Sequence, residues 1–371
     1  MEAIGRVMKA YVFQMVTDSW GDIPYFEALK GDSGITTPKY DSQRAIYLDM
    51  INELTTANNL FNTSADAIGA GDLIYGGNIT LWKKFCNSLK LRMLIRISKV
   101  EPALAQAGIE EILGSPATFP VFSANTDDAQ LVFVGTQPYR NPYYENKYGD
   151  GRDDHAVSKT LVDMLISYSD PRLPVYALPA ESDSVYRGQV NGAASQPNLA
   201  DISRIGRRFR DDPKAACYLM TYSEVLFIIA EAAQNGWNTG GIAAASAYDN
   251  AITANMSKWG ITSTAITTYL AGSSVDFSLA ANKYEAIAIQ KWLSLFTQEA
   301  EAFAEYRRSG FPVLQPAVAS IYPGHNVPPF RFPYPTDEES LNAANLAPAK
   351  AGIVDFLWGK QVWWDRRTGL N

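Results

Sequence analysis

The sequence predicts a mainly α-helical protein, in which stacked helix pairs flank a long, irregular, loop-rich insertion that carries short strands. Two observations lead to this fold class. Apolar residues recur at spacings of three and four over residues 1–114 and again over 216–310, which is the period of amphipathic helices. Residues 115–215, in contrast, are rich in Pro, Gly, Asn, Ser and Asp and show little periodicity.

The composition allows a large core and disfavours several classes of protein. Of the 371 residues, 47% are hydrophobic, so one large domain over 1–371 is expected. The net charge of −7 disfavours nucleic-acid binding. Cys86 and Cys217 lie in helix-like stretches and are predicted to be small buried residues. With two histidines in the chain, a zinc site is not expected.

Helices are predicted throughout residues 1–114. The first begins at the start of the chain, and a loop over 17–34 follows it, because this stretch is rich in Gly, Pro and Asp. The second covers 41–61, with Asp41 as its N-cap. The third covers 78–99, with its lysines and arginines opposite an apolar face, and a shorter helix covers 102–114. The first helix has its apolar residues at Ile4, Val7, Met8, Tyr11, Val12 and Met15.

The insertion at 115–215 is expected to hold one helix over about 156–168 and short strands, one of them at 131–134. A stretch of this length with little regular structure is usually functional when it is ordered. Its aromatic content argues against disorder. We therefore expect the insertion to bind the ligand.

Helix pairing returns after the insertion. Residues 216–235 and 242–258 form a pair whose small alanines at the crossing resemble a tetratricopeptide-type repeat. One long helix over 279–307 is expected to stack on this pair. The final segment, 311–371, is Pro-rich and predicted to be irregular.

No local pattern indicates catalysis. His155 and His325 are far apart in the sequence, and neither belongs to a Ser or Cys constellation that resembles a triad. Phosphate-binding and nucleophile motifs are absent from the sequence. No local pattern selects two carboxylates as a glycosidase pair, so a glycosidase is a distant alternative. The sequence therefore predicts a protein that is not an enzyme.

No cofactor is expected. The run DGRDD at 150–154 brings together carboxylates that suit a structural Ca²⁺. The spacing of an EF-hand is absent, however, and a polar turn is the favoured interpretation.

The stretch YRNPYYENKYGDGRDDH, residues 139–155, is the strongest candidate site. It reads as a loop, yet it places four tyrosines beside Asn, Arg and Asp. Sugars present an apolar face to aromatic rings and hydroxyls to planar polar groups. The alternative is that the tyrosines pin the loop to the helices. The candidate stacking residues are Tyr139, Tyr143, Tyr144 and Tyr148, the hydroxyl contacts Asn141, Arg152 and Asp153, and the outer candidates Trp20 and Tyr186.

Seven phrases in order resemble the SusD/RagB family of outer-membrane nutrient-binding lipoproteins, in its second SusD-like branch. They are YVFQMVTDSWGDIPYFEAL, LWKKFCNSLKLRMLIRIS, RDDHAVSKTLVDML with SDPRLPVYA, YSEVLFIIAEAAQNGW, AYDNAITANMSKWG, QKWLSLFTQEAEAFAEYRRSGFPVL and FRFPYPTDEESLNAAN. The resemblance implies tetratricopeptide-like helices and a loop-rich glycan-binding face. It also implies a position on the cell outer membrane, through a lipid anchor, as a partner of a SusC-type TonB-dependent transporter.

The sequence departs from the family in its N-terminal part. No signal peptide, lipobox cysteine or preceding helices are visible, so we expect an N-terminally truncated chain whose site is incomplete. Two alternatives to glycan binding stay open. The first is a peptide cargo in the same fold, and the second is a helical-repeat scaffold that binds only protein.

Overall fold

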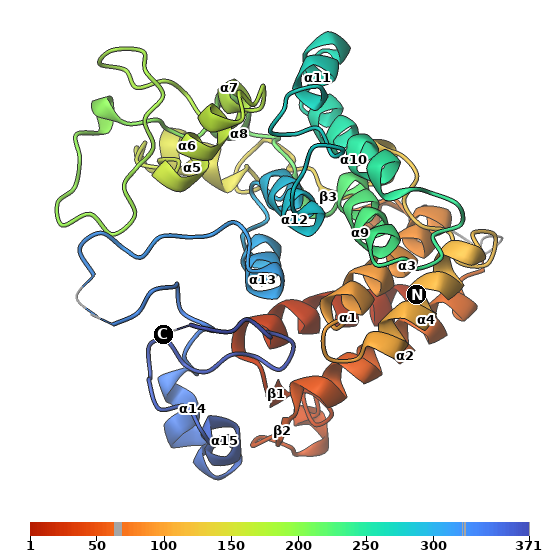
Figure 1. Cartoon of the computed structure of the whole chain (residues 1–371). Coiled ribbons are helices and arrows are strands. Elements are labelled where there is room, and N and C mark those ends of the chain that lie inside the picture. The colour runs from red at the N-terminus through yellow and green to blue at the C-terminus, as the bar shows by residue number, and fades with distance from the viewer. Residues whose placement is uncertain (63–68, 321, 323, 371) are drawn as a thin grey trace.

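The computed structural model describes residues 1–62, 69–320, 322 and 324–370. The described chain is mainly helical, as predicted (Figure 1). Its α-helices are α1 (Glu2–Trp20), α2 (Gln43–Leu60), α3 (Ile79–Arg96), α4 (Pro102–Gly114), α5 (Pro142–Tyr148), α6 (Lys159–Ser167), α7 (Leu173–Tyr176), α8 (Arg207–Arg210), α9 (Tyr222–Gln234), α10 (Ala244–Lys258), α11 (Ser263–Leu270), α12 (Lys283–Ser294), α13 (Glu299–Ser309), α14 (Thr336–Leu341) and α15 (Ala343–Lys350).

Two short antiparallel sheets connect distant parts of the chain. In one, β1 (Ile23–Pro24) pairs with β2 (Tyr40–Asp41). In the other, β3 (Ala129–Leu131) pairs with β4 (Cys217–Met220), with Ala129 opposite Met220 and Leu131 opposite Cys217. The second sheet joins the two ends of the insertion, so the segment between β3 and β4 leaves the helical stack and returns to it at one place.

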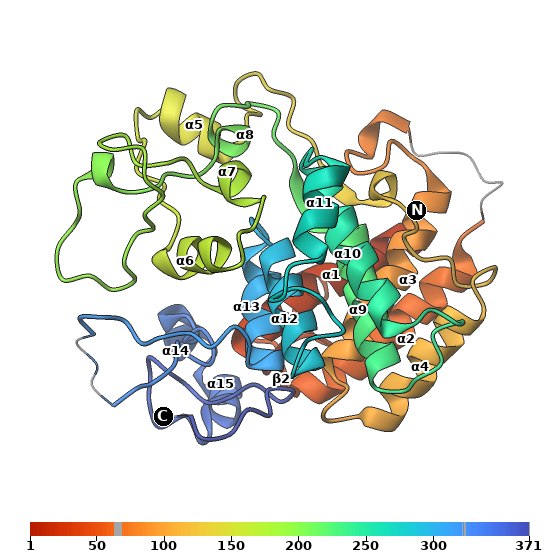
Figure 2. The same cartoon turned by 45° about the horizontal axis from the view of Figure 1, so that its top comes forward.

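The helical stack, the insertion and the C-terminal segment occupy separate regions. Figures 1 and 2 show α1–α4 and α9–α11 stacked together, with α5–α8 on one side and α14–α15 below them. In both views α12 and α13 lie between these regions. A second core cluster, which includes Leu165, Phe209, Trp259 and Leu293, packs the insertion onto α12 and the end of α10. These contacts hold the insertion beside α12.

From Phe85 to Arg96, helix α3 is buried on every side, so the prediction of a basic face opposite an apolar face is wrong for this part of the helix. Arg92 and Arg96 are only 2% and 1% exposed. The Arg92 guanidinium donates two hydrogen bonds of 2.6 Å to the Glu224 carboxylate of α9. The Arg96 guanidinium pairs with Glu301 of α13. The basic residues of α3 thus hold other helices instead of facing water.

Several boundaries also differ from the prediction. Helix α1 extends into the start of the predicted loop and ends at Trp20, because Asp18 is buried there and accepts hydrogen bonds from Tyr47 and Trp364. The N-cap of α2 is Ser42, whose hydroxyl accepts from the Ala45 N–H, and not Asp41. The predicted strand at 131–134 overlaps β3 only at Leu131.

The elements around β4 correct the prediction in the same way. Residues 217–220, expected at the start of a helix, form β4, and α9 begins after its N-cap Thr221. Both cysteines are free; Cys86 is buried as predicted, but Cys217 is exposed on β4. The C-terminal segment contains α14 and α15, so it is less irregular than expected.

The predicted long helix over 279–307 is broken. Helix α12 ends at Ser294 and α13 begins at Glu299. Thr297 in the intervening turn has a φ of 69°, in the left-handed region that a β-branched residue rarely adopts. The break matters because it turns the chain at the point where the insertion, α1 and the C-terminal segment converge.

The buried pair between α3 and α9 predicts a large effect on stability. Glu224→Gln removes the carboxylate that lies 2.6 Å from Arg92 and leaves Glu301, at 3.7 Å, as the remaining partner of this buried cation. We therefore expect the free energy of unfolding to fall by about 3 kcal/mol or more. Urea denaturation measures it. The control is Asp163→Asn, which breaks the exposed pair with Lys159 and is expected to change stability by less than about 1 kcal/mol. Equal small effects in both variants would contradict this interpretation.

Candidate functional site

Three adjoining cavities meet at the turn between α12 and α13, and we call them together the groove. The insertion cavity has a volume of about 300 Å³, the central cavity about 120 Å³ and the tail cavity about 540 Å³. Thr297 and Glu299 line both the insertion and the central cavity. Glu299 and Ala300 line both the central and the tail cavity. The three cavities therefore follow the start of α13 from the insertion to the C-terminal segment.

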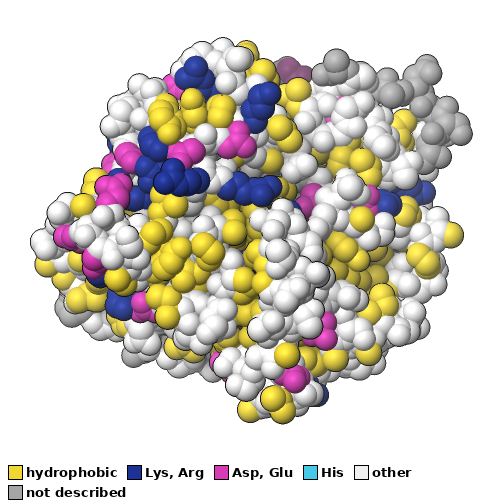
Figure 3. All heavy atoms as spheres, turned by 90° about the horizontal axis from the view of Figure 1, so that it is seen from above, with side chains coloured by type: hydrophobic (Ala, Val, Ile, Leu, Met, Phe, Trp, Pro, Cys, Tyr) yellow, Lys and Arg dark blue, Asp and Glu magenta, His cyan; other side chains and the backbone are white. Residues whose placement is uncertain are grey.

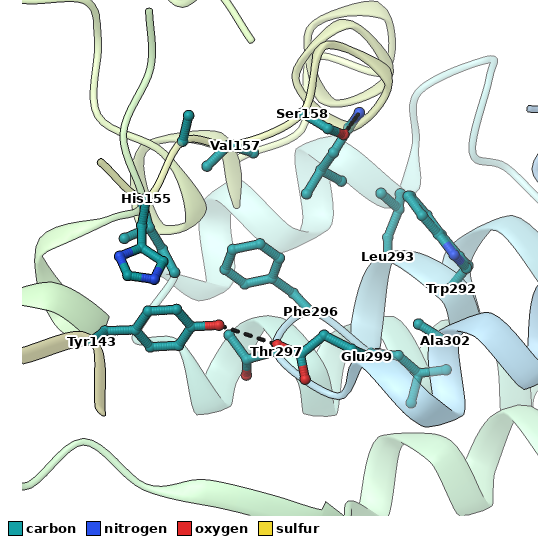
Figure 4. Close-up of a pocket in the computed structure, with 14 residues that line it drawn as sticks. Tyr143, His155, Val157, Ser158, Trp292, Leu293, Phe296, Thr297, Glu299 and Ala302 are labelled. Atoms are coloured by element: carbon teal, nitrogen blue, oxygen red, sulfur yellow. Dashed lines mark hydrogen bonds between the residues drawn. The ribbon is translucent and has the colours of Figure 1, made fainter. Parts of the chain in front are cut away.

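The insertion cavity is apolar with a few polar groups at its edge (Figure 4). Tyr143 and His155 from the insertion lie on one side, and Trp292 lies on the other, on α12. The Phe296 ring lies between the two sides. The Tyr143 ring packs edge-on against His155 at 5.1 Å between ring centroids. Flat apolar walls of this kind suit a ligand with an apolar face.

Glu299 is the carboxylate common to all three cavities. Its side chain accepts a hydrogen bond of 3.1 Å from the Tyr143 hydroxyl (Figure 4). Burial, and then the charge of Glu299, raise the pKa of Tyr143, so the phenol stays protonated and donates. No cation pairs with Glu299 in the described part of the chain. Its acceptor oxygens are thus available to hydroxyl or amine donors of a ligand.

The central cavity is lined by more polar and charged side chains than the other two cavities, and it carries signs of strain. Gln14 of α1 and Gln298 of the turn line this cavity, and both are buried. Within the described residues, neither carboxamide finds a hydrogen-bond partner. Together with the left-handed backbone of Thr297, these groups mark a place where the fold departs from its local optimum, as happens at functional sites.

The tail cavity is again aromatic. Phe303 of α13 and Phe332 of the C-terminal segment stack with centroids 6.0 Å apart. Trp20, at the end of α1, packs on Phe332 at 5.5 Å and donates its Nε1–H to the Pro333 carbonyl at 2.9 Å. Arg331 also lines this cavity. The groove therefore has aromatic residues at both ends and polar residues in its middle.

The predicted tyrosines take different places. Tyr143 lines the insertion cavity, but Tyr139 is 65% exposed and lines none of the three cavities. The Tyr144 ring packs on the Tyr148 ring at 4.6 Å, and the Tyr148 hydroxyl donates to Asp211. Tyr144 and Tyr148 thus pack on the insertion itself and lie outside the cavities described above.

The predicted loop 139–155 contains a helix, α5, so the assignment of the whole stretch as loop is wrong. Asn141 is its N-cap: the side-chain oxygen accepts from the backbone N–H groups of Tyr143 and Tyr144, and Nδ2 donates to the Ala215 carbonyl. Pro142 occupies the first helical position, which proline favours. Asn-Pro here starts a helix. Asn141 is buried and holds the helix that presents Tyr143.

The charged candidates pair within the insertion. Arg152 pairs with Asp154 at 3.0 Å, and Asp153 pairs with Arg210 and, at 3.4 Å, with Arg204. On the face seen from above in Figure 3, basic side chains gather with acidic side chains among them. Two carboxylates of DGRDD, those of Asp153 and Asp154, therefore pair with arginines. In the described residues no group of three acidic, His or Cys side chains is arranged to hold a metal.

The two outer candidates also separate. Trp20 adjoins the tail cavity through Phe332, as described above. Tyr186 is partly buried against the second core cluster, and burial raises the pKa of its hydroxyl. Tyr186 lines none of the three cavities, whereas Trp20 supports one of their walls.

Sequence reasoning missed the residues that line the groove from α12, α13 and the C-terminal segment. Trp292 is not among the predicted site residues, and Glu299 falls inside the single long helix predicted over 279–307. The signal for the break was present: Glu299 and Glu301 are two acidic residues that follow an apolar run, as in the first turn of a new helix. The missed residues are Trp292, Phe296, Gln298, Glu299, Phe303, Arg331 and Phe332.

The sequence and fold are similar to those of known proteins. Residues 1–335 match the family SusD-like_2, described as "Starch-binding associating with outer membrane". A chitin-binding protein of known structure is 30% identical with a TM-score of 0.81, covering 98% of this chain and 81% of that one. A chitin-binding SusD homologue from Flavobacterium johnsoniae is 27% identical with a TM-score of 0.84, covering 98% and 80%.

Further similarities agree with these. A SusD homologue from Bacteroides uniformis is 28% identical with a TM-score of 0.83 and coverages of 98% and 81%. No protein with a curated function matches the sequence. Across the described residues, no helix has the length and apolarity needed to cross a membrane. The match over residues 1–335 and the shared fold show that the chain belongs to the SusD-like_2 family, which is associated with the outer membrane.

Proposed function

We propose that this protein binds an oligosaccharide or polysaccharide chain along the groove. The observation that carries the proposal is the order of surfaces: aromatic rings at each end and a carboxylate without a cationic partner between them. A glycan chain presents a repeat of apolar ring faces edged by hydroxyls. Tyr143 and Trp292 at one end, and Phe303 and Phe332 at the other, would receive the ring faces.

The chemistry of the centre supports binding without catalysis. Glycoside hydrolysis uses two carboxylates that flank the scissile bond. Glu301, the other carboxylate at the start of α13, pairs with Arg96 and lies 3.7 Å from Arg92. Glu299 is thus left as a hydrogen-bond acceptor for hydroxyls, without a second free carboxylate beside it. We propose a binding protein and not an enzyme.

The partners follow from the family. Its description names starch binding and the outer membrane, and two structural neighbours are described as chitin-binding. We propose that this protein holds its glycan at the cell surface and passes it to a TonB-dependent transporter of the SusC type. A lipid anchor would tether it to the outer membrane. Chitin-derived and starch-derived glycans are the first ligands to test.

Loss of the aromatic wall of the insertion cavity should weaken binding. For Tyr143→Ala and Trp292→Ala we expect about a tenfold or greater loss of affinity each, because each removes a ring that a sugar face would contact. Affinity electrophoresis through gels that contain soluble starch, glycol chitin and plant and microbial polysaccharides measures the change.

Tyr139→Ala is the matched control, since Tyr139 lies in the same segment and outside the cavities. We expect it to migrate as the parent chain does. Retardation by none of the glycans would overturn the proposal, and retardation that survives both cavity variants would move the site elsewhere. Retention of a peptide library instead would favour a peptide cargo.

Glu299 should matter through its charge and its two acceptor oxygens. Glu299→Gln turns one acceptor oxygen into a donor, so we expect roughly tenfold weaker glycan binding by isothermal titration calorimetry. Glu2→Gln, which removes an exposed carboxylate at the start of α1 and outside the groove, is the control and should bind as the parent does. Unchanged affinity in Glu299→Gln would remove the carboxylate from the site.

A further inference from the structure

Arg331 is a buried cation without an ion pair to a carboxylate in the described chain. Among the buried arginines of the described residues, Arg92, Arg96, Arg172, Arg204, Arg210 and Arg308 each pair with a carboxylate. Arg307 has no ion pair but donates hydrogen bonds to the carbonyls of Phe303 and Phe330. Arg331 is 3% exposed, and its Nη2 has neither an ion pair nor a hydrogen bond in the described chain.

The backbone around Arg331 is shaped to hold it. A Cβ on Gly21 would lie 3.1 Å from Arg331 Nη1, and a Cβ on Gly359 would lie 2.6 Å from Arg331 Cγ. Both glycines have positive φ angles, 78° and 73°, which other residues rarely adopt. The slot that receives this side chain therefore requires glycine from two segments that are far apart in the sequence.

The groups around the guanidinium offset only part of the free-energy cost of burying its charge. It lies over the Tyr334 ring at 4.4 Å, a contact worth about 2 kcal/mol when desolvated. Burying a cation costs several kcal/mol after relaxation, and arginine cannot shed its proton to avoid this cost. Asp22, the nearby carboxylate, lies beyond ion-pair distance and accepts a hydrogen bond from the Gln43 N–H. An anion is the missing partner.

The charges around the tail cavity favour an anion at the Arg331 end. Arg331 lines only the tail cavity, whereas Glu299 lies where that cavity borders the other two. The Arg307 guanidinium sits 3.9 Å from the Phe303 ring centroid, behind one wall of the cavity. The tail cavity thus carries Glu299 at its border with the other two cavities and Arg331 within it, and the rest of its lining is largely apolar.

We propose that the tail cavity is a carboxylate subsite, in which Arg331 binds the carboxylate of an acidic sugar such as a uronic acid. This inference rests on glycan binding in the groove. The planar guanidinium matches a carboxylate, and Phe303 and Phe332 offer the ring that carries it an apolar wall. Glu299 would then meet hydroxyls of a neighbouring residue of the chain. The cargo differs in this respect from chitin, which carries no carboxylate.

The test compares matched ligands that differ only in the carboxylate. Oligosaccharides of polygalacturonate, alginate and hyaluronan, and the carboxyl-reduced form of each, are titrated into the full chain by calorimetry. We expect at least one acidic ligand to bind tenfold or more tightly than its reduced form. Arg331→Gln should abolish that difference, because it weakens binding of the acidic form more than binding of the reduced form. Arg366→Gln, which removes an exposed arginine, should behave as the parent chain.

The outcomes separate this inference from the proposed function. Equal binding of acidic and reduced forms overturns the carboxylate subsite and leaves glycan binding in place. Binding of neutral glycans alone also overturns the carboxylate subsite and leaves glycan binding in place. Binding of no glycan overturns the carboxylate subsite and the proposed function together. A peptide that binds with a free C-terminal carboxylate but not as its amide would reassign the subsite to a peptide. If Arg331→Gln fails to fold, the acidic and reduced ligands are compared on the parent chain and on Arg331→Lys. A preference of the parent chain for the acidic form that is smaller in Arg331→Lys supports the subsite, and no preference in the parent chain overturns it.

Discussion

A buried ion-pair network centred on α3 is the interaction on which the rest of this structure depends. Arg92 and Arg96, one helical turn apart, reach Glu224 on α9 and Glu301 on α13. Burying these charges is unfavourable unless every partner is in place. The network therefore specifies one arrangement of three helices. It also positions Glu299 of the groove, which precedes Glu301 by two residues on α13.

The groove exists because the chain breaks between α12 and α13. A continuous helix here would have kept Phe296, Thr297 and Glu299 in one regular helix. Instead, the left-handed Thr297 and the buried, unpaired Gln298 turn the chain where the insertion and the C-terminal segment converge. Such local strain persists only where the surrounding packing holds it, and the ion pairs of α13 and the second core cluster supply that packing.

Charged side chains are unevenly distributed along the groove. Its centre carries Glu299, and its tail cavity carries Arg331, with Arg307 behind one wall. A neutral ligand would use the aromatic rings and Glu299 and leave Arg331 unmatched, whereas an acidic glycan would engage both ends. Since stacking on aromatic rings tolerates many sugars, the position of these charges is the feature of the groove that would discriminate between ligands.

The sequence by itself determined the helical class, most helices and the family resemblance, because amphipathic spacing and phrase order are local properties of the chain. The aromatic stretch at 139–155 also predicted Tyr143 as a candidate site residue. Only the tertiary structure showed that Asn141 caps a helix and that Arg92 lies in the core. The same holds for Trp292, Glu299 and Arg331, which share one groove although long stretches of chain separate some of them. Long-range packing decides which side chains meet and which charges go unpaired, and no local pattern encodes it.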